Sequence, residues 1–418
     1  MQYIINAPSH IDTTIQLPSS KSISNRALVI HALSGGTQLP DNLSDCDDTE
    51  VIVRALRDMP PTIDIKAAGT AMRFMTAFLA VTDSGEHVLT GTQRMRHRPI
   101  GILVDALRQL GADIQYTGRE GFPPLRIRGQ RLDGGRLDVA GNVSSQYISA
   151  LLIVGAAMRD GMELHLTGDI ISRPYIDLTL CTMRDFGAKV EWTGPDTIVV
   201  EPGGYRPTPY FIESDWSAAS YWYEALCLSG EDSVVRLSGL TDGSRQGDSV
   251  ARYIFSLFGV KTIFDVREKG VPTTVTLKRY AVNLPRLEFS FINQPDLAQT
   301  YVVACAMLDI PFHFKGLSTL RIKETDRIEA LKKEMLKLGY VVRSTVDNEL
   351  IWNGEKCHAD THPVIDTYDD HRMALAFAPA CWRFPGLRIN NPAVVSKSYP
   401  RYWEHLKMAG YQIVEDNT

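Results

Sequence analysis

The sequence predicts an α/β protein made of six related units, three in each of two domains. Three observations support this fold class: the length of the chain, a recurring glycine and a recurring polar cluster. At 418 residues the chain exceeds the size of one ordinary hydrophobic core, so two domains are expected. A landmark that returns at a nearly fixed interval indicates repeated supersecondary units.

Five glycines each follow an amphipathic helical pattern and precede an apolar, strand-like run. Their separations are 76, 72, 80 and 71 residues. Before one of them, Ile328, Leu331, Met335 and Leu338 repeat with the spacing of a buried helix face. A glycine at such a junction supplies the left-handed backbone that ends a helix. The five are Gly111, Gly187, Gly259, Gly339 and Gly410.

A polar cluster begins a small-residue helix in every unit. After a short first interval of 49 residues, the cluster spacings follow those of the glycines. The first unit is therefore abbreviated, with its second helix expected at 45–59. Because a helix start exposes unpaired N–H groups and the positive end of the dipole, each cluster is a candidate site for phosphate or carboxylate. The clusters are counted from Ser20, Gly69, Ser144, Asp215, Asp296 and Asp370.

The repeat also places the domain boundaries, because no low-complexity linker separates the two halves of the chain. We expect the chain to cross between domains near 18–21 and again near 211–215. Domain 1 would hold residues 1–18 plus 214–418, and domain 2 would hold residues 19–213.

The overall charge argues against several classes of protein. The formal net charge of −5 is not that of a general nucleic-acid or membrane-surface binder, so an anionic ligand must meet a local cationic pocket. The N-terminus shows neither a basic region followed by an apolar segment nor an Arg/Ser-rich transit pattern, and the chain has no run of 18 apolar residues. We expect a soluble, cytoplasmic protein that binds neither nucleic acid nor membrane.

The cysteines do not suggest a metal site. They form no C-x-x-C pair, and we interpret them as reduced core residues. Cys357 and His358 with His362 lack a second paired ligand set, so this stretch is interpreted as a surface loop and no metal is expected. The six cysteines are Cys46, Cys181, Cys227, Cys305, Cys357 and Cys381.

Cationic side chains lie near two of the predicted helix starts, and a glycine lies at a third. Lys21 in a first turn opposes the helix dipole unless an anion binds there, although a solvated lysine fits equally well. Arg98 precedes Pro99, which would aim its guanidinium at the mouth of the following helix. At Gly69 the backbone permits close approach of a ligand and Thr70 is a candidate cap, but a simple tight turn is equally compatible.

A further pair of cations lies in the second half of the chain. Lys323 and Arg327, four residues apart, would share one side of a helix, a poor arrangement unless an anion lies between them. The alternating charges at 321–328 also fit an exposed, salt-bridged face. Asp296 follows a proline at another helix start, where its carboxylate is either an acidic first turn or a general base.

The last cluster combines caps with unexplained positive groups. Asp369 and Asp370 are suitable caps for the apolar helix at 373–380. Capping explains the aspartates, but it does not explain His371 and Arg372.

Taken together and in order, these motifs resemble the 5-enolpyruvylshikimate-3-phosphate synthase family over nearly the whole chain. The resemblance implies two domains of three βαβαββ units each, an inside-out α/β barrel with the active site in the interdomain cleft. It implies transfer of the enolpyruvyl group of phosphoenolpyruvate to the 5-hydroxyl of shikimate 3-phosphate, the penultimate step toward chorismate, without metal or organic cofactor. The matching segments are 19–26, 69–73, 98–101, 144–146, 172–175, 295–296, 323–327 and 370–373, with Lys397.

The same resemblance assigns residues to the two substrates. Asp296 would accept the proton of the attacking hydroxyl, Glu324 would protonate the methylene carbon, and Lys21 would bridge the substrates; Tyr175 and His371 would support the site. The residues implied for shikimate 3-phosphate are Lys21, Ser22, Arg26, Ser144, Ser145, Gln146, Ser172, Asp296 and Lys323. Those implied for phosphoenolpyruvate are Lys21, Gly69, Arg98, Gln146, Arg327, Arg372 and Lys397.

The charges of these substrates fit this set. Each phosphate carries roughly −1.5 to −2 at pH 7 and each substrate adds a carboxylate, so a pocket must neutralise about five to six negative charges. Repulsion among the cations would hold an empty cleft open, and bound anions would close it. The cations are Lys21, Arg26, Arg98, Lys323, Arg327, Arg372 and Lys397.

Some positions depart from the family pattern. Ala67 and Thr319 stand where asparagine occurs in other members of the family. At each of these positions the substrate hydrogen bond of that asparagine is not expected in the same form. Gly69 leaves no methyl to crowd the phosphoenolpyruvate phosphate, so inhibition by glyphosate is expected.

Two alternatives to this function remain, and a monomer is expected in each case. A sister enolpyruvyl transferase acting on UDP-N-acetylglucosamine would carry Lys-Asn near its start and usually a loop cysteine, whereas here Ser22 follows Lys21. A non-catalytic binder of phosphorylated metabolites would not require Lys21, Asp296 and Glu324 together.

Overall fold

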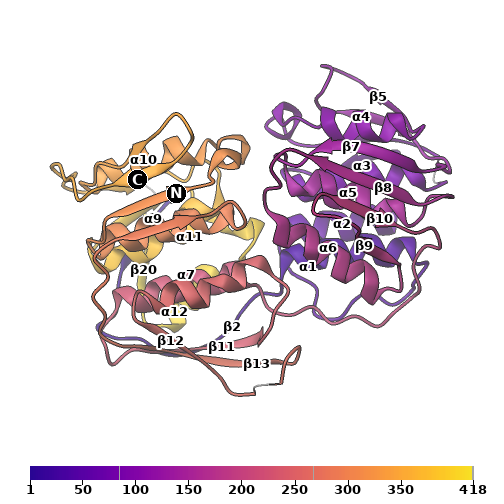
Figure 1. The fold of residues 1–418 in the computed structure, drawn as a ribbon. Helices are drawn as coiled ribbons and strands as arrows, with labels where there is room; N and C mark the ends of the chain where they lie inside the picture. The colour runs from indigo at the N-terminus through magenta and orange to yellow at the C-terminus, as the bar shows by residue number, and fades with distance from the viewer. Residues whose placement is uncertain (84, 267, 417–418) are drawn as a thin grey trace. The chain divides into compact units, whose positions relative to one another are not determined.

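The computed structural model describes residues 1–83, 85–266 and 268–416, and the chain forms two compact units (Figure 1). Unit 1 consists of Met1–Pro18 and Glu213–Thr418, and unit 2 is Ser19–Ile212. Each unit contains a large hydrophobic core cluster made only of its own residues. The chain therefore leaves unit 1 after two strands and returns to it only after unit 2 is complete.

All five sheets of the described residues have the same four-strand pattern. A parallel pair is followed by two antiparallel neighbours. In four of the five parallel pairs a single helix connects the two strands, as a parallel crossover requires, whereas all of unit 2 lies between β2 (Asp12–Gln16) and β11 (Val234–Thr241). A second helix leads to a hairpin in four of these sheets, and in the remaining one β20 (Gln412–Asp416) pairs with β1 (Gln2–Asn6). This is the order of a βαβαββ unit, and it confirms the α/β class and the repeat expected from the sequence.

Unit 1 contains three such sheets, and two of them borrow strands from the N-terminus. The contiguous repeat is β14 (Leu287–Ser290), α9 (Ala298–Met307), β15 (Phe312–Lys315), α10 (Arg327–Lys337), β16 (Arg343–Ser344) and β17 (Leu350–Trp352). A second repeat is β2 (Asp12–Gln16), α7 (Trp216–Leu228), β11 (Val234–Thr241), α8 (Ala251–Ser256), β12 (Val260–Phe264) and β13 (Pro272–Arg279). The third is β18 (Val364–Ile365), α11 (His371–Phe377), β19 (Leu387–Asn390), α12 (Tyr402–Met408), β20 (Gln412–Asp416) and β1 (Gln2–Asn6).

Unit 2 contains two complete repeats and an abbreviated one. One is β3 (Thr62–Asp64), α3 (Gly69–Val81), β4 (Glu86–Thr90), α4 (Gly101–Gln109), β5 (Asp113–Tyr116) and β6 (Leu125–Arg128). The other is β7 (Gly135–Ala140), α5 (Ser145–Gly155), β8 (Met162–Thr167), α6 (Arg173–Asp185), β9 (Val190–Trp192) and β10 (Thr197–Val200). The short first repeat supplies α1 (Lys21–Leu33) and α2 (Asp47–Asp58) without a four-stranded sheet of its own in the described residues.

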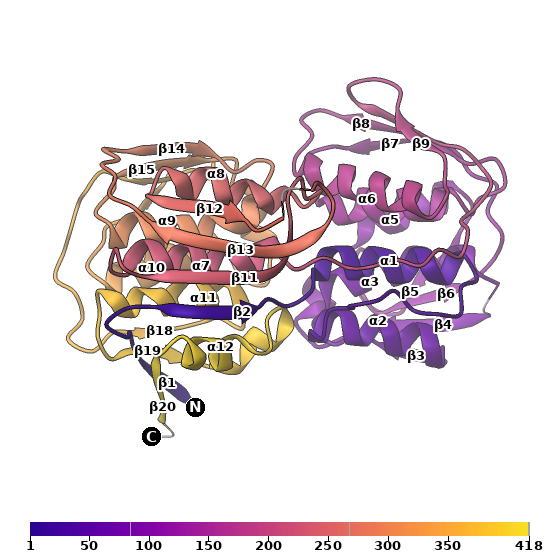
Figure 2. The ribbon, with the colours of Figure 1, turned by 90° about the horizontal axis from the view of Figure 1, so that it is seen from below.

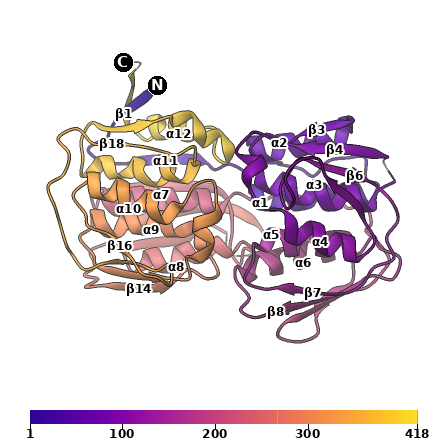
Figure 3. The same ribbon diagram turned by 90° about the horizontal axis from the view of Figure 1, so that it is seen from above.

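The first helix of each complete repeat lies in the interior of its unit. Every residue of α9 is buried, and so is every residue of α3 except the last. A helix that is buried on all sides belongs in a core, whereas the second helix of a repeat keeps an exposed face, as α10 does. Figure 2 shows β11 and β13 beside α7 in unit 1, and Figure 3 shows β4 and β7 on opposite sides of α3 and α5 in unit 2. Sheets outside and helices inside are the inside-out arrangement expected for this fold.

The landmark glycines end helices as predicted. All five have positive φ, between 81° and 96°, and each lies between the second helix of a repeat and the following strand. The polar clusters are less uniform: the Ser20, Ser144, Asp215 and Asp370 side chains cap their helices. The prediction that Thr70 caps α3 was wrong, because Ala68 is the N-cap residue and Thr70 lies inside the helix.

Five of the cysteines are at least partly buried, but Cys357 is exposed, so it is not the core residue that the sequence suggested. The structure forms no disulfide among the six. Among the described residues, none of the helices is both long enough and apolar enough to span a bilayer.

Candidate active site

Seven charged side chains form a compact cluster in unit 1, which we call the unit 1 cluster. They come from the turn before α9, the turn before α10, the first residues of α10 and α11, and the end of a short 3-10 helix at Pro392–Lys397. Four are cations and three are carboxylates. They are Asp296, Lys323, Glu324, Arg327, Asp370, Arg372 and Lys397.

Asp296 lies at the centre of the unit 1 cluster. Its Oδ1 is 2.8 Å from Arg327 Nη1 and 3.2 Å from Lys323 Nζ. Its Oδ2 is 3.3 Å from Arg372 Nη2. Burial raises the pKa of this carboxyl, but Arg372, Lys323 and Arg327 outweigh burial and hold the pKa well below its usual value. The carboxylate is therefore ionised at neutral pH and able to accept a proton.

Arg327 joins three carboxylates although its side chain is buried. Its Nε donates to Asp370 Oδ2 at 2.6 Å, and its Nη2 donates to Glu324 Oε2 at 3.0 Å, in addition to the bond to Asp296. Burial lowers the pKa of this guanidinium, and the three carboxylates raise it above its ordinary value. Arg327 is thus a permanently charged anchor for the cluster.

Lys323 and Arg327 do not share a helix face, contrary to the interpretation of their spacing. Helix α10 begins at Arg327 with Asp326 as its N-cap, and Lys323 lies in the preceding extended turn. They nevertheless converge on one anion, the Asp296 carboxylate. Burial lowers the pKa of Lys323, and Asp296 only partly restores it.

Glu324 is held between two cations. Lys397 Nζ lies 2.6 Å from Oε1, and Arg327 Nη2 lies 3.0 Å from Oε2. Two cationic partners favour the ionised carboxylate over the neutral acid. In this state Glu324 is a hydrogen-bond acceptor.

Arg372 is positioned by the Tyr221 hydroxyl and by the carbonyl and carboxylate oxygens of Asp296. Its Nη1 lies 3.3 Å from the hydroxyl of Tyr221 and 3.2 Å from the Asp296 carbonyl oxygen. Burial raises the pKa of Tyr221 to about 12, despite the neighbouring Arg372. The neighbouring His371 is buried, with Nδ1 at 3.7 Å from Asp370 Oδ1.

In unit 2, Lys21 has a carboxylate partner that the sequence did not indicate. Its Nζ is 3.3 Å from Oδ2 of Asp48, and the carboxylate is almost fully buried. Lys21 is the first residue of α1, and Asp48 is the second residue of α2. The anion that offsets the unfavourable dipole at Lys21 is therefore, in this structure, a side chain of the protein.

Gly69 is covered by guanidinium groups. A Cβ atom at this position would lie 2.6 Å from Arg98 Nη1 and 3.2 Å from Arg73 Nη1. Arg73 in turn donates to the carbonyls of Gly69 and Pro99. The expectation that Arg98 points at the start of α4 was wrong, because α4 begins at Gly101 and the guanidinium lies against the start of α3.

The start of α5 contacts the start of α3 through side chains. Gln146 Nε2 donates to Thr70 Oγ1 at 3.0 Å. Ser144 caps α5 by accepting from the Gln146 backbone N–H at 3.4 Å, and Ser145 is the first residue of that helix. This places Gln146 close to Gly69, the residue next to Thr70 in the sequence.

Arg26 is bound mainly by the protein itself. Its Nε donates to Thr179 Oγ1 at 2.7 Å, and its Nη groups donate to Ser149 Oγ and to the carbonyls of Ser22 and Tyr175. Burial lowers its pKa to about 10. These four bonds use four of the five N–H donors of a guanidinium, so one donor is left for a ligand.

Ser172, the N-cap residue of α6, has left-handed backbone with φ of 54°. For a residue other than glycine this conformation costs energy, and such strain concentrates at functional sites. Its side chain does not cap the helix. Arg26 donates to the carbonyls of Ser22, on α1, and of Tyr175, in the first turn of α6. Ser172, at the start of α6, therefore lies in the same neighbourhood as Ser22.

Sequence reasoning missed the residues that hold the predicted ones in place. Asp48, Tyr221 and Arg73 were not singled out, because each is an ordinary member of an acidic, aromatic or apolar helix in the sequence. Asp370 was interpreted only as a cap, but it also binds Arg327. Within the part of the chain that the structure describes, no group of three or more His, Cys, Asp or Glu side chains could hold a metal ion.

The seven predicted cations are therefore partly neutralised by the protein. In unit 1, Asp296, Glu324 and Asp370 lie within ion-pair distance of four of them, and in unit 2 Asp48 lies within ion-pair distance of Lys21. Repulsion among the cations is accordingly weaker than a count of cations alone suggested. The fold and these groups define a two-unit α/β protein in which both units carry cationic side chains near helix starts.

Comparisons with known proteins agree with this class. A family model described as EPSP synthase (3-phosphoshikimate 1-carboxyvinyltransferase) matches residues 5–63 and 59–406. A 3-phosphoshikimate 1-carboxyvinyltransferase of Bacteroides fragilis is 55% identical over 413 residues, which cover 99% of each chain. One from Aliivibrio fischeri is 34% identical over 96% of this chain and 97% of its own. The chain belongs to the EPSP synthase family, whose members are transferases.

Solved structures show the same fold. An EPSP synthase from Acinetobacter baumannii superposes with a TM-score of 0.79 at 22% identity, covering 99% of this chain and all of its own. The enolpyruvyl transferase NikO from Streptomyces tendae gives a TM-score of 0.74 at 18% identity, covering 99% and 98% of the two chains.

Proposed function

We propose that this protein transfers the enolpyruvyl group of phosphoenolpyruvate to the 5-hydroxyl of shikimate 3-phosphate and releases phosphate, a step in the synthesis of chorismate and the aromatic amino acids. Membership of the EPSP synthase family supports this reaction. The single structural observation that supports it most is the Asp296 carboxylate, ionised among three cations and next to Glu324. A base and a second carboxyl among cations suit proton transfer on anionic substrates.

The unit 1 cluster would supply the proton-transfer groups. The oxygen of the 5-hydroxyl bonds to C2 of phosphoenolpyruvate, its proton passes to Asp296, and C3 takes a proton from Glu324. The tetrahedral ketal phosphate then loses phosphate, and C3 returns a proton to the Glu324 carboxylate as the double bond forms again. Lys21 would stabilise the charge that develops during both steps.

Glu324 needs a proton for this role, although its two cationic partners favour the ionised form. We propose that phosphoenolpyruvate itself changes this balance. Lys397 is among the cations assigned to that substrate, and its bond to Glu324 is 2.6 Å. If the substrate anion binds Lys397, Glu324 loses one of its cationic partners and is easier to protonate.

The remaining residues would bind and orient the substrates. Guanidinium groups suit carboxylate and phosphate because they bind such groups at two points. We propose that Arg98, Arg327, Arg372, Lys397, Gly69 and Gln146 hold phosphoenolpyruvate. Lys323 and the serines Ser22, Ser144, Ser145 and Ser172 would hold shikimate 3-phosphate with Gln146 and the remaining donor of Arg26.

The two units would act together, as domains 1–18 plus 214–418 and 19–213, on substrates bound in the cleft between them. We further propose that the protein acts as a cytoplasmic monomer and that its substrates close the cleft. Small-angle scattering with and without both substrates tests closure: identical profiles contradict it.

The reaction is tested by following phosphate release from phosphoenolpyruvate with shikimate 3-phosphate as acceptor. UDP-N-acetylglucosamine in its place is the control for the sister activity. Phosphate release from phosphoenolpyruvate with shikimate 3-phosphate, but not with UDP-N-acetylglucosamine, supports the proposal. Release only with UDP-N-acetylglucosamine supports the sister transferase, and release with neither acceptor supports a binding protein.

A further inference from the structure

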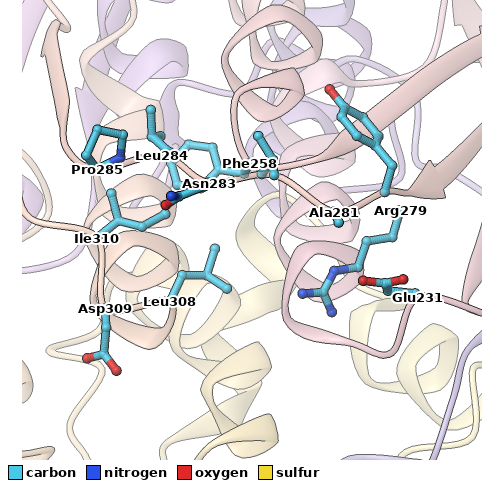
Figure 4. A pocket seen from close by; sticks show the side chains of 12 residues that line it. Glu231, Phe258, Arg279, Ala281, Asn283, Leu284, Pro285, Leu308, Asp309 and Ile310 are labelled. Carbon is cyan, nitrogen blue, oxygen red and sulfur yellow. The ribbon is translucent and has the colours of Figure 1, made fainter.

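A pocket of about 380 Å³ lies in unit 1, apart from the unit 1 cluster (Figure 4). It is formed by the segment that follows β13, by Phe258 after α8, and by Leu308–Ile310 after α9. Helix α9 starts two residues after Asp296, and its ten residues span about 15 Å. The pocket is therefore at the opposite end of this helix from the predicted general base.

One end of the pocket carries two opposite charges. Figure 4 shows Arg279 and Glu231 together there. The strand register explains their proximity, because Val234 of β11 pairs with Lys278 of β13, next to Arg279. Within the described residues, the structure gives neither side chain an ion pair or hydrogen bond. Both head groups are thus available to a ligand.

The other end of the pocket has apolar side chains beside the amide of Asn283. Leu284, Pro285 and Ile310 lie there in Figure 4, and Phe258 and Ile310 are only 3% and 8% exposed. Asp309, also in the lining, is already paired with Lys356 at 2.6 Å. The unpaired charges are therefore at one end, and the larger apolar side chains lie at the other.

The wall between these ends is held in place by the backbone. The Tyr280 N–H donates to the Gly259 carbonyl at 2.8 Å, and the Tyr280 hydroxyl donates to the Ser256 carbonyl at 2.6 Å. A side chain at Gly259 would collide with the Tyr280 carbonyl oxygen. Because Gly259 has no side chain, the backbone of Tyr280, a residue of the pocket lining, can pack closely against it.

We propose that this pocket binds a free α-amino acid with an apolar side chain. The ammonium and carboxylate of an amino acid are attached to one carbon, which matches an acidic and a basic group at the same end of a pocket. Its side chain would lie against Phe258, Leu284 and Ile310. The volume of about 380 Å³ lies within the range of small-molecule sites.

The test is calorimetric titration of the full-length protein with L-phenylalanine and L-leucine. Phenethylamine and 3-phenylpropionate, which each lack one of the two charges, are the ligand controls. We expect saturable 1:1 binding of at least one amino acid and at least tenfold weaker binding of both analogues. Absence of saturable binding of either amino acid up to 10 mM, or equal binding of the analogues, overturns the proposal.

Variants locate the site. R279Q and E231Q should each weaken amino-acid binding at least tenfold, whereas R286Q, which removes a nearby arginine paired with Glu288, should not. Circular dichroism checks that each variant is folded. Binding that survives both pocket substitutions overturns the proposal. The titrations are repeated with both proposed substrates present, and loss of binding there would place the amino acid in the substrate site and also overturn it.

Discussion

Arg327 and Asp370 form a two-point ion pair in the interior of unit 1. Nε lies 2.6 Å from Oδ2 and Nη2 lies 3.2 Å from Oδ1, and both side chains are almost completely excluded from solvent. The same Asp370 caps α11 by accepting from the backbone N–H of Arg372 at 3.0 Å. One carboxylate therefore fixes the start of α11 against the start of α10, and with them two of the predicted substrate-binding arginines.

Asp370→Ala should destabilise the protein strongly. Removing one partner of a buried ion pair leaves an uncompensated charge, which costs about 3–5 kcal/mol. Loss of the N-cap of α11 adds roughly 1 kcal/mol to this destabilisation. Asp370→Asn should avoid this additional loss, because the amide oxygen of asparagine can also cap the helix. Urea unfolding of both variants measures these losses. The matched control is Glu404→Ala, which breaks the exposed pair with Arg401 and should cost far less stability than Asp370→Ala. A loss for Asp370→Ala no larger than that of the control contradicts the argument.

Asp296→Asn should abolish most of the activity without preventing substrate binding. An amide cannot accept the hydroxyl proton, and positioned general bases contribute roughly 10²- to 10⁴-fold to rates. The expected result is a fall of that size in kcat, measured by phosphate release. The control is Asp12→Asn on β2, which removes an exposed carboxylate paired with Arg236. An Asp296→Asn enzyme with more than a tenth of the wild-type kcat would exclude the base assignment.

The local signals in the sequence predicted the repeat well. The five glycines needed only the 3.6-residue helical pattern before them and the strand-like run after them, and both are local properties. The sequence could not show that β1 and β2 complete sheets with strands far away along the chain. Those pairings join Gln2 to Asp416 and Asp12 to Val234, and such long-range partners leave no mark in a single sequence.

The sequence singled out charged residues near helix starts, but not the side chains that contact them in the structure. Capping and charge patterns identified Lys21, Lys323 and Arg372, because cations near helix starts are unusual. Their partners were not predictable, since Asp48 and Tyr221 reach them only through tertiary packing. The direction of Arg98 was predicted wrongly for the same reason: its guanidinium turns to α3, not to the helix that follows it in the sequence.

Glu224→Leu should make the protein more stable at neutral pH and alter the pH dependence of its stability. Glu224 is completely buried on α7, and its carboxyl oxygens have no hydrogen-bond partner in the described residues. Burial raises its pKa well above the ordinary value, in surroundings that include Cys227, Tyr402 and Tyr411. An unsatisfied buried polar group costs about 1–3 kcal/mol, which leucine removes.

The sign of this pH dependence follows from the raised pKa. The folded protein binds the Glu224 proton more tightly than the unfolded chain does. The corresponding stability is fully present below the unfolded pKa of about 4.3 and is lost as the pH rises through the folded pKa. Wild type should therefore lose free energy of unfolding between pH 5 and 8 relative to Glu224→Leu. Urea titrations at both pH values measure the difference, and parallel curves for the two proteins would refute the prediction.

Gly69→Ala should weaken phosphoenolpyruvate binding while the fold is retained. The added methyl would lie 2.6 Å from Arg98 Nη1, so this guanidinium, which we assign to phosphoenolpyruvate, must move. Because the obstacle is the end of a flexible side chain, little stability should be lost. We expect the KM for phosphoenolpyruvate to rise about tenfold, equivalent to about 1.4 kcal/mol, and the concentration of glyphosate needed for half inhibition to rise as well. Gly101→Ala, at the first position of α4, is the matched control, since its Cβ would meet only ordinary contacts at 3.5 Å or more. Unchanged kinetics in Gly69→Ala would show that Arg98 does not contact this substrate.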